Sequence, residues 1–314
     1  MNTIQDLDIA ILIPARNEAA ALPQVITELR EALPSATIYV YDNNSTDGTP
    51  EIAASLGAVV RREREQGKGH VVRRMFSDIE ASVYVLVDGD DTYSAAAAPR
   101  LVQTLLDERC DMVNARRVHA DARAYRLGHA TGNRVLTGLV AAIFGARIQD
   151  ILSGYRVFSR RFVKSFPALS TGFEIETELT IHALALHMPV AEVETPYRER
   201  PPESVSKLRT VRDGFRILGT ILLITKEEQP FFFFSVIAVL FAALSIGLAI
   251  PVILTYLKTG LVPRFPTAIL AASIMGLAFL ALASGMILSS VARGRRELRR
   301  LHYLNLPWLT GRGP

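Results

Sequence analysis

The chain has 314 residues, 21% of them charged, and a net charge of +4 from 35 Lys and Arg against 31 Asp and Glu. Its single cysteine, Cys110, excludes an intrachain disulfide bond and fits a reducing compartment. Hydrophobic residues are unevenly distributed, because residues 1–228 have the composition of a globular protein whereas 229–257 and 265–292 contain no charged residue. This distribution indicates a globular part followed by two long apolar segments.

In the first 91 residues, strand patterns alternate with helix patterns. Apolar runs rich in β-formers predict strands at 6–14, 36–42, 58–63 and 83–87. Between them, apolar residues at helical spacing predict helices at 19–33, 49–57 and 67–82. This alternation is typical of an α/β domain whose sheet is mostly parallel.

After residue 95 the pattern is less regular. It predicts helices at 99–110, 128–145 and 173–187 and strands at 111–117 and 190–200. Residues 150–166 begin as a polar turn, DILSGYR, and continue with helical spacing. We expect the globular domain to occupy residues 1–205.

The C-terminal third predicts attachment to a membrane. Residues 206–228 form a basic amphipathic segment, which we expect to lie on the membrane surface or, alternatively, to pack on the globular domain. The runs 229–257 and 265–292 are both longer than the roughly 20 apolar residues that cross a bilayer. We predict two transmembrane helices there, with a buried helical hairpin as the alternative.

Charged residues around the two runs predict their orientation. The loop 258–264 carries only one Lys and one Arg, whereas the tail 293–314 begins with the basic sequence RGRRELRR. By the positive-inside rule the loop is extracytoplasmic, and the tail and the globular domain are cytoplasmic. The expected location is the inner (plasma) membrane, with two passes.

Four polar loops follow the predicted strands of the first half. They are ARNE at 15–18, DNN at 42–44, GKG at 67–69 and DGDD at 88–91. Ligands of parallel α/β sheets bind beyond the carboxyl ends of the strands, so these loops should meet at one edge. Their convergence is a stronger indication of a binding site than any one of them.

The chemistry of two of these loops suggests a metal and a diphosphate. Asp88 and Asp90 at a strand end suit a hard divalent cation such as Mg²⁺, which takes one or two carboxylates plus phosphate oxygens and water. Glycines beside Lys68 would let backbone N–H groups approach an anion. No GxxxxGK[ST] loop and no GxGxxG after the first strand is present, which argues against ATPases and nucleotide-dependent oxidoreductases.

Taken together, these motifs resemble family 2 glycosyltransferases with the GT-A fold. ILIPARNE, VYDNNSTDGT, GKG and VDGDD occur in the order and spacing of that family. DILSGYR and YRERPPESVSKLRT are similar to its polyprenyl-phosphate branch, which includes dolichyl-phosphate mannose synthases and bacterial undecaprenyl-phosphate glycosyltransferases. The resemblance implies a GT-A domain with a Rossmann-like, mostly parallel sheet, followed by amphipathic interfacial helices and two C-terminal transmembrane helices.

The resemblance also implies roles for individual residues. Those that would bind the nucleotide-sugar are Pro14, Ala15, Arg16, Asn17, Glu18, Asp42, Lys68, Asp88, Arg200 and Lys207. Asp88 and Asp90 would hold Mg²⁺ or Mn²⁺, with Asp90 the more direct ligand. Arg116, Arg126 and Arg156 would receive the acceptor phosphate. Asp150 stands where a base is usually proposed, and it could equally orient Arg156 or another cation.

The implied reaction is an inverting transfer of one sugar from a UDP- or GDP-sugar to a polyprenyl phosphate. The expected partners are that donor, that acceptor and the lipid bilayer, with no nucleic acid. Bacterial members of the branch often form oligomers, so homo-oligomerisation belongs to the expectation. One alternative is a processive polysaccharide synthase, although those carry a QxxRW segment and the only tryptophan here is Trp308. Another is a non-catalytic membrane scaffold that retains the nucleotide-sugar fold.

Overall fold

The computed structural model describes residues 4–119, 129–144, 148–198 and 210–309. Contacts divide the chain into two compact units. The first, called the sheet unit, comprises Met1–Gly219 together with Arg299–Pro314. The second, called the apolar-helix unit, comprises Thr220–Leu298.

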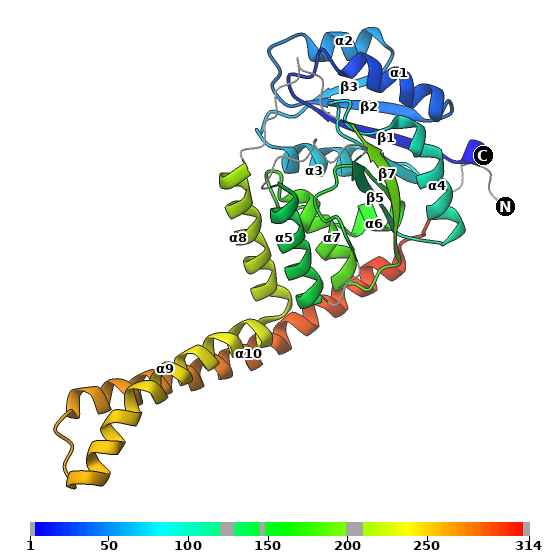
Figure 1. Cartoon of the computed structure of the whole chain (residues 1–314). Coiled ribbons are helices and arrows are strands. Elements are labelled where there is room, and N and C mark those ends of the chain that lie inside the picture. Colours follow the sequence, from blue (N-terminus) through cyan, green and yellow to red (C-terminus); the bar gives the residue numbers. More distant parts are fainter. Residues whose placement is uncertain (1–3, 120–128, 145–147, 199–209, 310–314) are drawn as a thin grey trace. The chain divides into compact units, whose positions relative to one another are not determined.

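The sheet unit contains a seven-stranded sheet with helices on its faces (Figure 1). Its strands are β1 (Ile9–Ala15), β2 (Thr37–Asp42), β3 (Val59–Arg62), β4 (Val83–Leu86), β5 (Met112–His119), β6 (Arg156–Ser159) and β7 (Val190–Tyr197). Its α-helices are α1 (Leu22–Ala32), α2 (Thr49–Ser55), α3 (Lys68–Asp78), α4 (Ala98–Asp107), α5 (His129–Phe144), α6 (Arg160–Ser165) and α7 (Ile175–Ala185). Two short 3₁₀ helices are η1 (Ile4–Asp6) and η2 (Ala95–Ala97).

The strand order is β3-β2-β1-β4-β6-β5-β7. β3, β2, β1 and β4 run parallel, β6 runs antiparallel to both β4 and β5, and β7 is parallel to β5. The carboxyl ends of β1, β2, β4 and β5 and the start of β6 therefore lie at one edge, called the site edge. The predicted α/β, mostly parallel sheet is confirmed.

Strand β6 was not predicted, because the sequence at 150–166 suggested a turn followed by a helix. It is only four residues long, all four are buried, and α6 begins at the next residue. A buried strand this short has no alternating pattern to separate it from the start of a helix.

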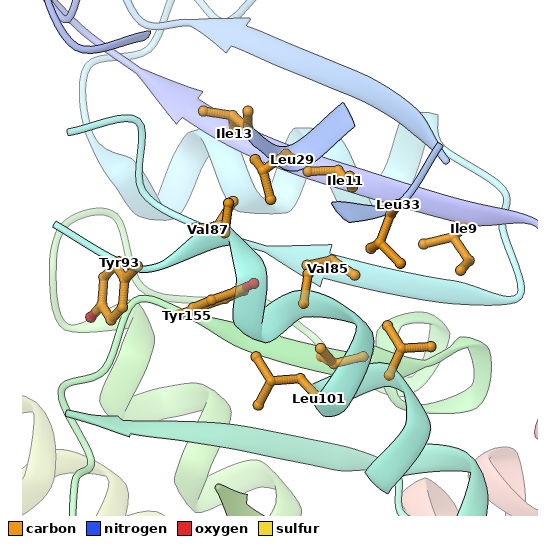
Figure 2. Close-up of a cluster of buried hydrophobic side chains, with 14 of the residues drawn as sticks. Ile9, Ile11, Ile13, Leu29, Leu33, Val85, Val87, Tyr93, Leu101 and Tyr155 are labelled. Carbon is orange, nitrogen blue, oxygen red and sulfur yellow. The ribbon is translucent and has the colours of Figure 1, made fainter. Parts of the chain in front are cut away.

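One face of the sheet packs against α1 and α4 (Figure 2). Side chains alternate between faces along a strand, so Ile9, Ile11 and Ile13 of β1 all point toward Leu29 of α1 and Leu33 just after it. On β4, alternation likewise places Val85 in this cluster and sends Tyr84 to the opposite face. Burial of apolar surface stabilises a folded protein by about 25 cal/mol per Å², so such a cluster is the main stabilising contribution to the unit.

The opposite face carries an aromatic cluster. Phe158 of β6 stacks on Phe162 with ring centroids 4.6 Å apart, and Phe76 of α3 meets Phe158 edge to face at 5.8 Å. His182 of α7 lies edge-on to Phe162. Burial lowers the pKa of His182 to about 3, which keeps the imidazole neutral among these rings.

The C-terminal segment of the sheet unit packs beside the start of β5. Tyr303 donates a 2.6 Å hydrogen bond to the Asp111 carboxylate, which is fully buried and also accepts from Arg161 at 2.6 Å. The Arg161 guanidinium lies 4.7 Å from the centre of the Tyr303 ring. Trp308 donates to the carbonyl of Cys110 at 2.9 Å. Residues at the end of the chain thus complete a domain that begins near its start.

The apolar-helix unit is built from long helices. α8 (Thr210–Glu228) enters it, α9 (Pro230–Thr259) lies within it, and α10 (Phe265–Asn305) runs through it. α9 and α10 are both long and apolar enough to cross a membrane. Ser245 of α9 donates to the Ala271 carbonyl of α10 at 2.7 Å, which satisfies a hydroxyl that apolar surroundings would otherwise leave unpaired. α10 continues past the predicted span end at 292, since the basic residues that follow are good helix formers.

Replacing Tyr303 with Phe should destabilise the sheet unit. The substitution removes the hydroxyl that the buried Asp111 carboxylate accepts from, and leaving a buried charged group short of a partner costs about 1–3 kcal/mol. We expect the midpoint of thermal unfolding in detergent to fall by a few degrees. Tyr256→Phe makes the same chemical change at a half-exposed side chain and should leave the midpoint unchanged. Equal midpoints for the two variants would contradict this role of Tyr303.

Candidate active site

The polar loops predicted to converge do meet at the site edge. The Asn17 backbone N–H donates to the Ser45 hydroxyl at 2.9 Å, and the Asn17 side-chain oxygen accepts from the Thr46 N–H at 2.8 Å. The Asn43 side-chain oxygen accepts from the Gly67 N–H at 2.8 Å. Lys68 contacts Asp88. Each loop follows a parallel strand, so strand direction alone brings the four together.

Around the first two loops, the predicted nucleotide-binding residues lie close together. Pro14 and Ala15 end β1, and Arg16, Asn17 and Glu18 follow directly. Asp42 ends β2, is buried, and accepts a 3.1 Å hydrogen bond from the backbone N–H of Ser45. This arrangement shapes a rigid rim between β1 and β2. Arg126, Arg200 and Lys207 lie outside the described residues, so their predicted roles stay predictions.

The glycines of the GKG loop allow two backbones to approach closely. A Cβ on Gly69 would lie 2.2 Å from the Ser170 carbonyl oxygen, and one on Gly67 would lie 2.1 Å from that of Thr171. The Gly69 N–H donates to the Thr171 carbonyl and the Gly67 N–H to Asn43. The expectation that these N–H groups are available to an anion is therefore wrong for this structure. The glycines instead fit the 170–171 loop against α3.

Lys68 lies between two carboxylates. Its ammonium is 2.5 Å from Asp88 Oδ1 and 2.5 Å from Glu176 Oε1 of α7. Burial by itself would lower the pKa of Lys68, but attraction to Asp88 and Glu176 outweighs it and raises that pKa, so the ammonium stays charged. Burial raises the pKa of Glu176, while Lys68 opposes the shift.

The DGDD loop presents its carboxylates in three different ways. Asp88 contacts Lys68, and Asp90 is buried with Oδ1 accepting from the Thr92 hydroxyl at 2.6 Å. Asp91 has a left-handed backbone with φ of 56°, and its Oδ1 is buried with no hydrogen-bond partner in the described part of the chain. Burial raises the pKa of Asp91, and the charge of Glu28 adds to that shift.

The donor set limits what kind of metal site this loop can make. Within residues 4–119, 129–144, 148–198 and 210–309, no group of three or more His, Cys, Asp or Glu side chains is arranged to hold a metal ion. Two carboxylates with oxygen ligands from elsewhere match the usual Mg²⁺ or Mn²⁺ arrangement. The residues therefore fit a cation that shares its ligands with a phosphate group and water.

Asp150 forms an ion pair with Arg117 of β5. Its two oxygens accept from Arg117 Nε at 2.7 Å and Arg117 Nη2 at 2.8 Å, a fork-to-fork geometry that fixes the guanidinium plane. The Asp150 side chain is 5% exposed and that of Arg117 is 19% exposed. The guanidinium also lies 5.5 Å from the centre of the Tyr197 ring. Burial by itself would lower the pKa of Arg117, but Tyr93 and Asp150 raise it.

The loop that carries Asp150 touches the DGDD loop. A Cβ on Gly154 would lie 2.2 Å from Asp88 Oδ2, so only glycine permits this approach. The Gly154 N–H donates to the Tyr93 hydroxyl at 2.8 Å. The antiparallel direction of β6 explains the contact, because the start of β6 pairs beside the carboxyl end of β4 with Arg156 opposite Leu86.

The predicted phosphate-binding arginines that the structure describes have different surroundings. Arg156 is fully buried and donates to the carbonyls of Ser153 at 3.0 Å and Ile151 at 2.8 Å. Burial lowers its pKa to about 10. Arg116 lies on the other face of β5 from Arg117 and contacts Glu194 and Gln149. Arg156 therefore holds the Asp150 loop in shape, and a phosphate contact by either residue stays a prediction.

Sequence reasoning missed Arg117, and it considered Glu176 only as one of three glutamates that could be functional but are commonly a solvated turn at a helix start. Arg117 follows Arg116, and alternation along the strand sends their side chains to opposite faces, so only one of them can pair with Asp150. Glu176 is the middle of three acids in FEIETE, and spacing within one helical turn did not single it out. Glu174 and Glu178 have local roles, since they accept from backbone N–H groups of residues 169–172.

The amino-acid sequence is similar to those of known glycosyltransferases. The model of glycosyl transferase family 2 matches residues 10–166. Glycosyltransferase AglJ of Haloferax volcanii is 33% identical over 243 residues, which cover 77% of this chain and 80% of AglJ. The dolichyl-phosphate hexose transferase of the same organism is 29% identical over 223 residues, covering 71% of this chain and 96% of that protein.

A solved structure shows the same fold. Glucosyl-3-phosphoglycerate synthase from Mycobacterium tuberculosis, in complex with Mn²⁺, UDP-glucose and phosphoglyceric acid, aligns with a TM-score of 0.54 at 24% identity. The alignment covers 70% of this chain and 83% of that one. The predicted GT-A fold of the sheet unit is confirmed.

Gly69→Ala should lower stability because the new methyl group meets a backbone carbonyl rather than a movable side chain. Forcing an extra carbon into such a contact costs about 1–3 kcal/mol. Gly138→Ala in α5 is the matched control, since a Cβ there meets no atom within 4 Å and alanine is the better helix former. We expect thermal unfolding to begin earlier in Gly69→Ala and no earlier in Gly138→Ala. Unchanged unfolding of Gly69→Ala would argue against the close packing of the two loops.

Proposed function

The chain belongs to glycosyl transferase family 2, and we propose that it transfers one sugar from a nucleoside-diphosphate sugar to a polyprenyl phosphate at the cytoplasmic face of the membrane. The products would be a polyprenyl-phosphate sugar and a nucleoside diphosphate. The observation that carries the proposal is the Asp150–Arg117 pair, a fixed cation on the loop whose Gly154 approaches Asp88. An anionic acceptor needs such a cation, and an uncharged sugar acceptor does not.

The donor would bind along the rim formed by the ends of β1, β2 and β4. Residues 14–18 and Asp42 would contact the nucleotide, and Asp88 and Asp90 would hold a divalent cation together with oxygens of the diphosphate. That cation would neutralise negative charge on the departing nucleoside diphosphate. The solved relative with UDP-glucose supports testing a UDP-sugar first.

On the acceptor side, the main difficulty is repulsion between two anions. A phosphate monoester has a second pKa near ~6, so at neutral pH it is largely dianionic and already nucleophilic. Its oxygen would attack the anomeric carbon as the bond to the diphosphate breaks, which inverts the configuration. Arg117 would offset the charge of the incoming phosphate, since its guanidinium is partly exposed and its plane is fixed by Asp150.

This charge balance favours an orienting role for Asp150. Both of its oxygens accept from Arg117, and Oδ1 also accepts from the Leu152 N–H at 3.3 Å. An acceptor that is already ionised does not require a base. Asp150 would therefore act through Arg117. The sequence left open whether Asp150 is a base or orients Arg156 or another cation, and we propose that Arg117 is that other cation.

The acceptor's lipid nature is supported by two separate observations. α9 and α10 are long and apolar enough to cross a membrane, and a polyprenyl phosphate keeps its tail in the bilayer. A relative that aligns over 71% of this chain is named a dolichyl-phosphate hexose transferase. We propose that the helices anchor the enzyme in the plasma membrane with the sheet unit in the cytoplasm.

A transfer assay tests the proposal directly. Purified full-length protein in detergent receives undecaprenyl phosphate, Mg²⁺ or Mn²⁺, and a panel of radiolabelled UDP- and GDP-sugars, and label is counted in the lipid phase. Label from one sugar would establish the reaction and name the donor. Absence of lipid label from every donor, with label instead entering a long polymer, would replace the proposal by a processive synthase.

Asp90→Asn should nearly abolish transfer. The amide keeps the shape of the side chain and one acceptor oxygen for Thr92 but loses the charge that would hold the metal. We expect kcat to fall at least a hundredfold, about 3 kcal/mol of transition-state stabilisation. Asp107→Asn on the exposed end of α4 is the control and should transfer at the normal rate. A fully active Asp90→Asn enzyme would refute the metal assignment.

Asp150→Asn separates an orienting carboxylate from a base. Loss of the charged bonds to Arg117 should raise the KM for polyprenyl phosphate about 10- to 100-fold and leave the KM for the nucleotide-sugar nearly unchanged. An orienting role predicts the same deficit at pH 6 and pH 8. A base would be needed less as rising pH ionises the acceptor phosphate. If the loss of activity in Asp150→Asn is smaller at pH 8 than at pH 6, Asp150 acts as a base.

A further inference from the structure

Lys68 connects three parts of the chain that lie far apart in sequence. It begins α3, its ammonium contacts Asp88 after β4, and it also contacts Glu176 on α7, 108 residues further on. Both contacts are 2.5 Å long, and the lysine side chain is only 9% exposed. One ammonium is thus shared between a carboxylate of the DGDD loop and a carboxylate outside it.

Lys68 is a shared partner of two carboxylates. Two carboxylates face one ammonium, and Glu176 Oε2 is buried without a hydrogen-bond partner in the described part of the chain. A buried carboxylate oxygen with no partner is unfavourable, and additional positive charge in its neighbourhood reduces that cost. Arg156 is a second cation in this neighbourhood, because burial lowers its pKa and Glu176 opposes that shift. What Lys68 leaves unsatisfied is therefore the Oε2 atom of Glu176.

We propose that Lys68 neutralises Asp88 until a divalent cation replaces it there, and that Glu176 is a positioning residue that holds the ammonium when Asp88 changes partner. The inference rests on the proposed function, because it takes Asp88 as a metal ligand. An oxygen that accepts from an ammonium at 2.5 Å is a poorer metal ligand, since the two cations repel and share one lone-pair region. Glu176 weakens this competition by giving the ammonium a second partner.

The chain already places the lysine where this exchange needs little movement. Lys68 contacts both carboxylates at once, so leaving Asp88 requires only that the ammonium turn toward Glu176. The stem is fixed by the fit of Gly67 and Gly69 against residues 170–171, just before α7 begins. The ammonium would then lie beside the bound diphosphate as an additional positive charge.

Mn²⁺ binding to the full-length protein tests the inference without relying on activity. Mn²⁺ is titrated alone and with UDP or GDP, and free Mn²⁺ is measured by electron paramagnetic resonance. Lys68→Met removes the competing charge at similar length and should bind Mn²⁺ more tightly than the wild type. Glu176→Gln leaves the ammonium to Asp88 alone and should weaken Mn²⁺ binding about tenfold.

The double variant separates this mechanism from a simple change of local charge. If Glu176 acts through Lys68, then adding Glu176→Gln to Lys68→Met should change Mn²⁺ affinity by less than about twofold. The same tenfold loss in both backgrounds would overturn the inference, because Glu176 would then act directly or by its charge alone. Weaker binding by both single variants would overturn it as well.

Folding and the proposed function are controlled separately. Glu108→Gln and Lys258→Met make the same chemical changes at exposed side chains and should bind Mn²⁺ as the wild type does. If Lys68→Met does not fold, Lys68→Gln takes its place in both backgrounds. If the wild type binds no Mn²⁺, the metal site and this inference are refuted together. If the wild type binds Mn²⁺ and the effects of Lys68→Met and Glu176→Gln on Mn²⁺ affinity add, the inference alone is refuted.

Discussion

The ammonium of Lys68 is the charge on which the site edge depends. Asp88, Asp90 and Glu176 bring three carboxylates into a largely buried region, and Lys68 directly contacts two of them. In a medium of low polarity, carboxylates this close cannot all stay ionised without a nearby cation. The lysine also joins α3, the end of β4 and α7, so the same contact that balances charge holds three segments in place.

The mixed direction of the sheet provides the other half of the site. In a wholly parallel sheet, the turn before β6 would lie at the edge opposite the DGDD loop. Because β6 is antiparallel to β4, the turn that carries Asp150 reaches Asp88, with Gly154 at the point of contact. β5 runs antiparallel to β6, so Arg117 near its carboxyl end reaches the same edge. The DGDD loop and the Asp150–Arg117 pair thus come to the same edge through one reversed strand of four residues.

The sheet unit is assembled from both ends of the chain. Tyr303 and Trp308 contact residues at the start of β5, at the edge opposite the site, and the Asp111 carboxylate is satisfied partly by Tyr303. The chain therefore leaves this unit, forms the long apolar helices and returns. A segment with the composition of a basic tail contains two aromatic residues that complete the domain, so its removal would affect more than charge.

The sequence by itself determined the alternation of strands and helices, the two apolar helices and the convergence of the polar loops. These follow from local periodicity and from the rule that parallel strands end at one edge, which need no knowledge of distant contacts. Only the tertiary structure decided the partners. It placed Arg117 rather than Arg156 on Asp150, buried Arg156 against carbonyls, and turned the glycines of GKG toward residues 170–171. These choices depend on which strand is reversed and which backbones touch, and pairings between residues so far apart in sequence leave no periodic pattern along the chain.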